Sequence, residues 1–179
     1  MKYRGLFVLM IVVGLLSGCA HTWSPSQIPA IGLDSVGAFQ EDLSVDLIND
    51  QPNTTPQLFA GISGHTHYAN YNEWTEFFIR DFGAELAKRG VKVSQDSTNK
   101  MKVKLGNFAF FQGFAKVRVN MTVRLESADG GWSKTFEETD TSGWSMGRAF
   151  GSVVYHTIEK LMRDNEVMSR MKTVKSAQQ

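Results

Sequence analysis

The stretch Ala115-Lys-Val-Arg-Val-Asn-Met-Thr-Val-Arg-Leu-Glu126 decides the fold class. Apolar and polar side chains alternate strictly along it, which is the period of a strand with one buried and one solvated face. A half-polar strand of this kind is typical of antiparallel sheets, because parallel sheets are usually covered on both faces. Turn signals stand on both sides, Gln112-Gly113 before it and Asp129-Gly130-Gly131 after it. We therefore expect a three-stranded antiparallel meander over 101–139.

Two amphipathic helices are expected to cover this sheet. Within 73–89, apolar residues recur at intervals of three and four, and Asn72 is the expected N-cap. A second apolar stripe begins near Trp144, with Ser142 as the expected cap. The alternating segment 43–48 adds a further strand. The predicted fold is α+β with two layers, an antiparallel sheet of about four strands with both helices on one face, in the order β-α-β-β-β-α.

The beginning of the chain has the pattern of an export signal. Lys2 and Arg4 precede the apolar run Gly5 to Leu16, and the chain's one cysteine follows in Leu16-Ser-Gly-Cys19. As a helix the run would measure about 18 Å, too short to cross a hydrocarbon core of about 30 Å. The end of the run resembles the lipobox of bacterial lipoproteins, in which the cysteine is acylated and the chain is cut just before it. A plain secretory signal with an incidental cysteine is the alternative.

Removal of residues 1–18 as a signal peptide would leave 17 Lys and Arg against 18 Asp and Glu, so the formal charge changes from +1 to −1. The remaining chain lacks the net positive charge that would indicate nucleic acid as a partner. We expect attachment to the membrane through the N-terminal lipid. Residue 20 is Ala rather than Asp, which resembles outer-membrane lipoproteins of enteric-type bacteria. We expect a lipidated tether over 19–41, a periplasmic α+β domain over 42–171 and a flexible tail over 172–179.

A histidine and tyrosine cluster is the first candidate binding surface. It comprises His65, His67, Tyr68 and Tyr71, within a segment, 54–71, that is predicted to be a long polar loop. Alternate histidines in an extended chain point to the same side and could ligate Zn²⁺ or Cu²⁺, although further ligands would be needed. A loop whose polar side chains cover neighbouring surface explains the cluster equally simply.

An aromatic hairpin is the second candidate. Phe108 and Phe110 are expected to face the core, with Phe111 near a bulge. Phe111 and Phe114 are the candidate surface residues, because such a tip could contact a partner protein or lipid headgroups.

The chain carries no recognisable catalytic signature. A nucleophile elbow and a zinc-protease helix are both missing from the sequence, and the adjacent Glu137 and Glu138 would face opposite ways on a strand. His156 lies in the second predicted helix and is expected to be structural. We therefore expect no enzymatic activity, no cofactor and no resident metal. A metal-dependent hydrolase that uses His65 and His67 is the less favoured alternative.

The chain as a whole resembles the YajG-like family of small bacterial lipoproteins. The resemblance depends on the lipobox, the strand at 43–48, the segment Leu86-Ala-Lys-Arg-Gly-Val-Lys-Val93, the long alternating strand with the Gly-rich turn after it, and Asp164-Asn-Glu-Val167. It implies a lipoprotein of the outer membrane of a Gram-negative bacterium, on the periplasmic side. The predicted function is a non-enzymatic binding or scaffolding module with an envelope protein as partner. The alternative is an auxiliary subunit of an envelope lipid-transport or lipopolysaccharide-assembly system.

Overall fold

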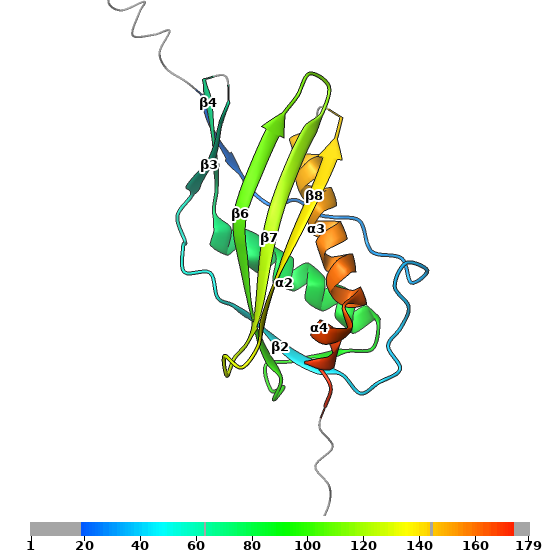
Figure 1. Cartoon of the computed structure of the whole chain (residues 1–179). Helices are drawn as coiled ribbons and strands as arrows, with labels where there is room; N and C mark the ends of the chain where they lie inside the picture. The colour runs from blue at the N-terminus through cyan, green and yellow to red at the C-terminus, as the bar shows by residue number, and fades with distance from the viewer. Residues whose placement is uncertain (1–18, 63, 144, 174–179) are drawn as a thin grey trace, which may run out of the picture.

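The computed structural model describes residues 19–62, 64–143 and 145–173, and this part of the chain forms an α+β fold with two sheets (Figure 1). The predicted signal peptide, 1–18, lies outside the described residues. The elements in chain order are β1 (Ala20–Trp23), β2 (Ser44–Asn49), β3 (Gln57–Ile62), β4 (His65–Ala69), α2 (Tyr71–Lys88), β5 (Lys92–Val93), β6 (Lys100–Gln112), β7 (Val117–Ser127), β8 (Ser133–Ser142), α3 (Met146–Arg163) and α4 (Asn165–Ser169).

The larger sheet has five strands in the order β5-β2-β6-β7-β8. The predicted meander is confirmed as β6-β7-β8, in which both pairs are antiparallel. The prediction of one antiparallel sheet of about four strands is wrong in two respects, because β2 pairs parallel with both β5 and β6 and because a second sheet exists. The parallel pairs arise because the chain leaves β2 and returns to the sheet only after α2, and such a crossover brings the next strand back in the same direction.

The smaller sheet has three strands in the order β1-β4-β3. The segment 54–71, predicted to be a polar loop, contains the antiparallel hairpin β3–β4, which turns at Gly64 with a positive φ of 80°. β1 pairs parallel with β4 and comes from the predicted tether. The order β-α-β-β-β-α is therefore incomplete, since it lacks the four short strands β1, β3, β4 and β5 and the short helix α4.

Both long helices lie on one face of the larger sheet, as Figure 1 shows, with α2 against β2 and β6 and α3 against β7 and β8. The alternation in the long strand buries one face completely, from Val117 to Leu125. The opposite face carries Lys, Arg, Asn, Thr and Glu side chains. Each helix begins with a different cap from the one predicted. Asn70 caps α2, because its Oδ1 accepts from Asn72 N at 3.1 Å, and Ser145 caps α3 because Ser142 still belongs to β8.

The segment predicted to be a tether, 19–41, instead packs on the domain. Ile31 and Val36 are buried, and the guanidinium of Arg89, itself 1% exposed, donates to the backbone oxygens of both residues. Glu85 completes the clamp with an ion pair to Arg89 and a hydrogen bond from Ile31 N at 3.0 Å. A buried guanidinium needs acceptors for its five donors; the backbone of this segment supplies three of them and Glu85 supplies the other two.

The predicted flexible tail is only partly within the described residues. Lys172 forms an isolated bridge with Leu43, and Thr173 N donates to Asp42 O at 3.0 Å, so the first part of the tail is attached to the domain. Residues 174–179 lie outside the described residues, as does Trp144 at the predicted start of the last helix. Within the described part of the chain, no helix is both long enough and apolar enough to span a membrane.

Candidate functional site at the Cys19 end of the fold

The predicted lipidation residue is hydrogen-bonded directly to the fold. Cys19 is exposed, and its carbonyl oxygen accepts a hydrogen bond of 2.9 Å from Thr66 N. The next four residues form β1, which follows β4 in register from Ala20 opposite Thr66 to Trp23 opposite Ala69. No flexible spacer therefore separates Cys19 from the domain.

Trp23 ties β1 to the core. Its backbone oxygen accepts from Trp74 Nε1 at 2.9 Å, its own Nε1 donates to His67 Nδ1 at 3.0 Å, and its ring stacks on Phe150 with centroids 6.2 Å apart. Trp74 and Phe150 are both 2% exposed. The strand that begins at the predicted anchor is thus held by side chains of both long helices.

Three histidines from two strands lie together at this end. His65 and His67 do point to the same side, as the sequence predicts, but from β4 rather than from a loop, and both stack against His21 of β1 with centroids 5.2 and 5.4 Å apart. His21 Nε2 and His65 Nδ1 share a hydrogen bond of 3.0 Å. Trp23 fills the Nδ1 acceptor position of His67. These hydrogen bonds engage three of the six ring nitrogens, and together with the ring stacking they link β1 to β4.

The electrostatics of the cluster favour the neutral form of His67. His67 is 7% exposed, and burial lowers its pKa, with a further lowering from the neighbouring His21 and His65. Among the residues that the structure describes, no group of three or more His, Cys, Asp or Glu side chains is arranged to hold a metal ion. The geometry gives no support to a metal-dependent hydrolase here.

Tyr68 and Tyr71, the other members of the predicted cluster, lie elsewhere. Tyr68 is partly buried on β4 and pairs with Leu58 on one side and Thr22 on the other. Tyr71 is the first residue of α2, and its hydroxyl accepts from Phe108 N at 3.2 Å while its ring stacks on the Phe108 ring. Burial raises the pKa of Tyr71. Tyr71 therefore serves packing, whereas Tyr68 alternates with His65 and His67 along β4 and so lies on the other face of that strand.

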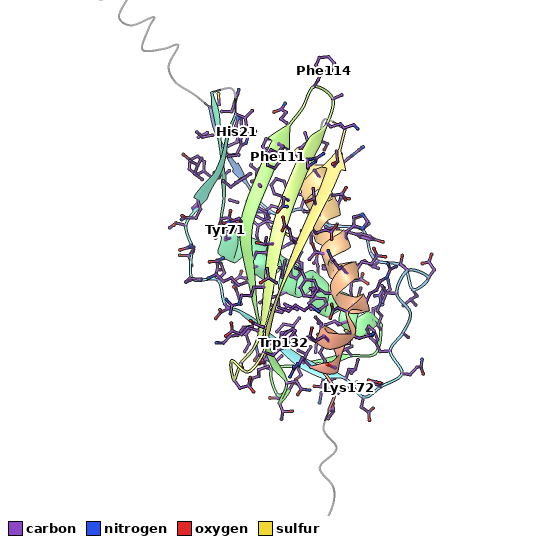
Figure 2. All side chains as sticks on the ribbon, viewed as in Figure 1. His21, Tyr71, Phe111, Phe114, Trp132 and Lys172 are labelled. Atoms are coloured by element: carbon purple, nitrogen blue, oxygen red, sulfur yellow. The ribbon has the colours of Figure 1, made fainter. Side chains whose placement is uncertain are left out.

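The aromatic hairpin divides as the sequence predicts. Phe108 and Phe110 are buried, at 3% and 6% exposed, whereas Phe111 and Phe114 are 59% and 95% exposed. The register shift in this pair of strands lies between Leu105 and Phe108 rather than at Phe111. Figure 2 shows Phe114 at the tip of the β6–β7 hairpin, at the same end of the molecule as His21.

Exposed cations lie at this end, and Asp140 of β8, which pairs in register with Val119 and accepts from Ser152, is a carboxylate beside it. The segments that build this end, 19–33, 57–72, 105–125 and 141–158, contain no Asp or Glu. Their exposed cations near the tip are Lys116, Arg118 opposite Phe111, and Arg148 in the first turn of α3. Within the described residues, none of these three side chains forms an ion pair.

His21 and Trp23 are the functional residues that sequence reasoning missed. Their signal was present, because Ala20 and Thr22 alternate with them at the period of a strand. Four residues next to a proline-containing segment are too few to separate a strand from a tether by pattern alone.

A groove of about 640 Å³ between β8 and α3 is the other polar concavity of note, and His156 lines it. Ser152 Oγ donates to Asp140, and His156 Nε2 lies 3.4 Å from the same carboxylate. Both groups thus contact Asp140, and within the described residues no hydrogen bond joins the His156 ring to the Ser152 hydroxyl. Acidic and basic side chains of this groove form ion pairs with one another; Lys160 Nζ, for example, lies 2.9 Å from Glu138 Oε2.

Fold and site together describe an α+β domain whose first strand starts at its predicted lipidation residue. No family model matches the chain, and no curated protein matches it. Among solved structures, it is similar to an uncharacterized protein (10% identity, TM-score 0.37, 83% of this chain and 99% of the other). It is similar also to a candidate neuraminyllactose-binding hemagglutinin homolog from Helicobacter pylori (11%, 0.35, 81% and 96%) and to lipoprotein GNA1162 from Neisseria meningitidis (12%, 0.33, 68% and 99%).

Proposed function

We propose that this protein is a lipid-anchored, non-enzymatic binding or scaffolding module of the bacterial envelope, attached through Cys19 to the periplasmic side of the outer membrane. The observation that carries the proposal is the position of the one cysteine. It ends a lipobox-like sequence, and it is also exposed immediately before β1, the strand that is tied into the core. An acyl group on Cys19 would therefore hold the whole domain at the membrane surface.

The geometry of the polar groups supports a non-enzymatic role. His67 Nδ1 accepts a hydrogen bond from Trp23 Nε1, and the Tyr71 hydroxyl accepts one from Phe108 N. Ser152 and His156 share one carboxylate instead of forming a nucleophile and base. A binding role needs an uncovered surface instead, and the polar face of the β6-β7-β8 meander is uncovered by any other element of the described chain. An envelope protein is the partner we assign to this face.

Metabolic labelling with a clickable fatty acid tests the anchor. The wild-type chain should incorporate the label and remain with the membrane fraction, and Cys19→Ser should lose both properties. Ser24→Ala, an exposed change just beyond β1, is the matched control and should label as wild type does. Labelling of Cys19→Ser at the wild-type level would overturn the proposal.

In-cell crosslinking tests the binding surface. A photoreactive residue at Thr135, exposed on the polar face of β8, should give a discrete crosslinked protein. The same residue at Glu76, exposed on α2 and away from that face, is the control. Equal crosslinking from both positions would show that the polar face is not the binding surface.

A further inference from the structure

We propose that the β6–β7 hairpin tip is a second membrane contact, in which Phe111 and Phe114 enter the interface of an anionic bilayer while Lys116, Arg118 and Arg148 contact its phosphates. The inference rests on the proposed anchoring through Cys19 and specifies how the domain is oriented on the lipid. It concerns residues that have no part in the lipid attachment itself.

The first argument is the missing spacer. Cys19 O accepts from Thr66 N, so the acylated residue would sit at the edge of the smaller sheet, next to the first residue of β1, and not at the end of a long tether. The end of the molecule that carries Cys19 must then lie close to the bilayer, since the lipid attaches at that residue.

The second argument is that the hairpin tip lies at this same end. Gln112, two residues before Phe114, lines one concavity with Ile62, His65 and His67 of the β3–β4 hairpin. Thr66 in that hairpin binds Cys19. Figure 2 shows His21 and Phe114 at one end of the molecule, and Trp132 and Lys172 at the other. An anchor at Cys19 therefore brings the tip toward the membrane.

The third argument is the chemistry of the tip. Two large aromatic side chains are exposed at 59% and 95%, and aromatic rings are favoured at the membrane interface. Three exposed cations flank them, with no carboxylate in the sequence segments that build this end. Because these three positive charges form no ion pair within the described residues, this end is electrostatically complementary to an anionic surface.

The test places an environment-sensitive fluorophore on the tip of the full-length lipidated chain. Acylation blocks Cys19, so Phe114→Cys supplies the one thiol that can be labelled with the dye NBD. Ala128→Cys, exposed in the β7–β8 turn at the opposite end, is the matched control. Both proteins are reconstituted on vesicles of three parts phosphatidylethanolamine to one part phosphatidylglycerol, and flotation is measured in the same samples.

We expect a blue shift and an increase in NBD emission at position 114 and no change at position 128. Changing Lys116 and Arg118 to Glu in the Phe114→Cys chain should reduce the shift while flotation is retained, because the lipid still anchors the protein. Both positions are exposed, so a thermal melt should match that of the parent chain.

Emission at position 114 that stays characteristic of water, in a protein that floats with the vesicles, would overturn the membrane contact and leave the anchor intact. The tip would then be a surface for a protein partner. Loss of flotation in the parent chain would overturn the anchoring, and the inference with it. The two failures are thus distinguished within one experiment.

Discussion

The two ends of this molecule satisfy their charges in opposite ways. At the end formed by the β7–β8 turn and α4, Lys134 Nζ lies 2.8 Å from both Asp164 and Glu166, and Trp132 Nε1 donates to Glu166 at 2.7 Å. At the Cys19 end, Lys116 and Arg118 have no carboxylate partner within the described residues. One end pairs its charges within the fold, whereas the other displays exposed cations that an anionic surface can neutralise, together with two exposed aromatic rings.

Because of this difference, the formal net charge of the chain does not indicate which partner each end attracts. A formal charge near zero indicated no anionic partner, yet the carboxylates are concentrated away from one end of the fold. Local charge segregation, rather than the sum over the chain, decides what a surface attracts. The two ends should therefore respond differently to substitution and to acid, with effects that decrease from Trp132→Ala to Phe114→Ser.

Trp132→Ala should have the largest effect on stability. Trp132 is 8% exposed, its N–H serves Glu166, and Arg170 stacks over its ring at 5.5 Å. Removing a buried tryptophan costs about 3–5 kcal/mol. Urea unfolding should show this loss, and Trp132→Phe should lose less because it keeps most of the buried ring. A loss below about 1 kcal/mol for the alanine variant would mean that this end is not a packed unit.

Trp23→Ala should have a smaller global effect and a large local one. The change removes the donor to His67 and the stack on Phe150, but β1 is an edge strand that can open without unfolding the domain. We expect a loss of about 1–3 kcal/mol and faster amide exchange in β1 and β4 than in β7. Uniform acceleration across all strands would contradict this independence. Trp23→Phe retains the stacking ring and should exchange more slowly than Trp23→Ala.

Mild acid should loosen the Cys19 end before the other end. Since the folded-state pKa of His67 lies below its ordinary value of 6.5, the unfolded chain binds more protons as the pH falls below that value. This contribution to stability is therefore present at neutral pH and is lost on acidification. Exchange of β1 amides at about pH 5.5 should rise more in wild type than in His67→Phe, after correction for intrinsic rates.

The opposite end should resist the same change. Burial alone would raise the pKa of Asp164, but the hydrogen bond from Lys134 and those from backbone amides hold it below 3.8. Hydrogen bonds from Lys134 and Trp132 likewise hold the pKa of Glu166 below 4.5. Because both values are lowered, the stabilisation is present above the ordinary values and is lost only as the pH falls below them. Loosening of α4 near pH 5.5 would contradict the contrast between the ends.

Phe114→Ser should have the smallest effect on stability. The side chain is 95% exposed, so the free energy of unfolding should change by less than about 0.5 kcal/mol. A loss of more than about 1 kcal/mol would mean that the ring serves the fold instead of an external surface. Phe110→Ser, at the buried position on the same strand, is the destabilising comparison.

The sequence could predict the parts of the fold in which a long pattern and burial agree. The segment 115–126 alternates over its whole length, and the two helices bury continuous apolar stripes, so the meander and its helical layer were predictable. β1, β3, β4 and β5 were not, because strands of two to six residues give too few periods. Parallel pairing of β2 depends on the path through α2, which local pattern does not contain.

The candidate site was predictable only in pieces. The lipobox and the exposed pair Phe111 and Phe114 could be found from sequence, but their location at one end depends on β1 pairing with β4. Arg89 shows the same limit. It is the last residue of the helix predicted over 73–89, yet its guanidinium is buried and donates to backbone oxygens more than fifty residues earlier in the chain. Tertiary partners of this kind leave no local signal.

Neutron reflectometry of the lipidated full-length protein on a supported bilayer tests the central claim most directly. A flexible tether over 20–41 would hold the domain at a distance of about 25 Å, the root-mean-square span of a chain of this length. The fold described here, with Cys19 bound to Thr66, predicts instead that the protein layer begins at the headgroups. A water-filled layer about 25 Å thick between lipid and protein would contradict the account.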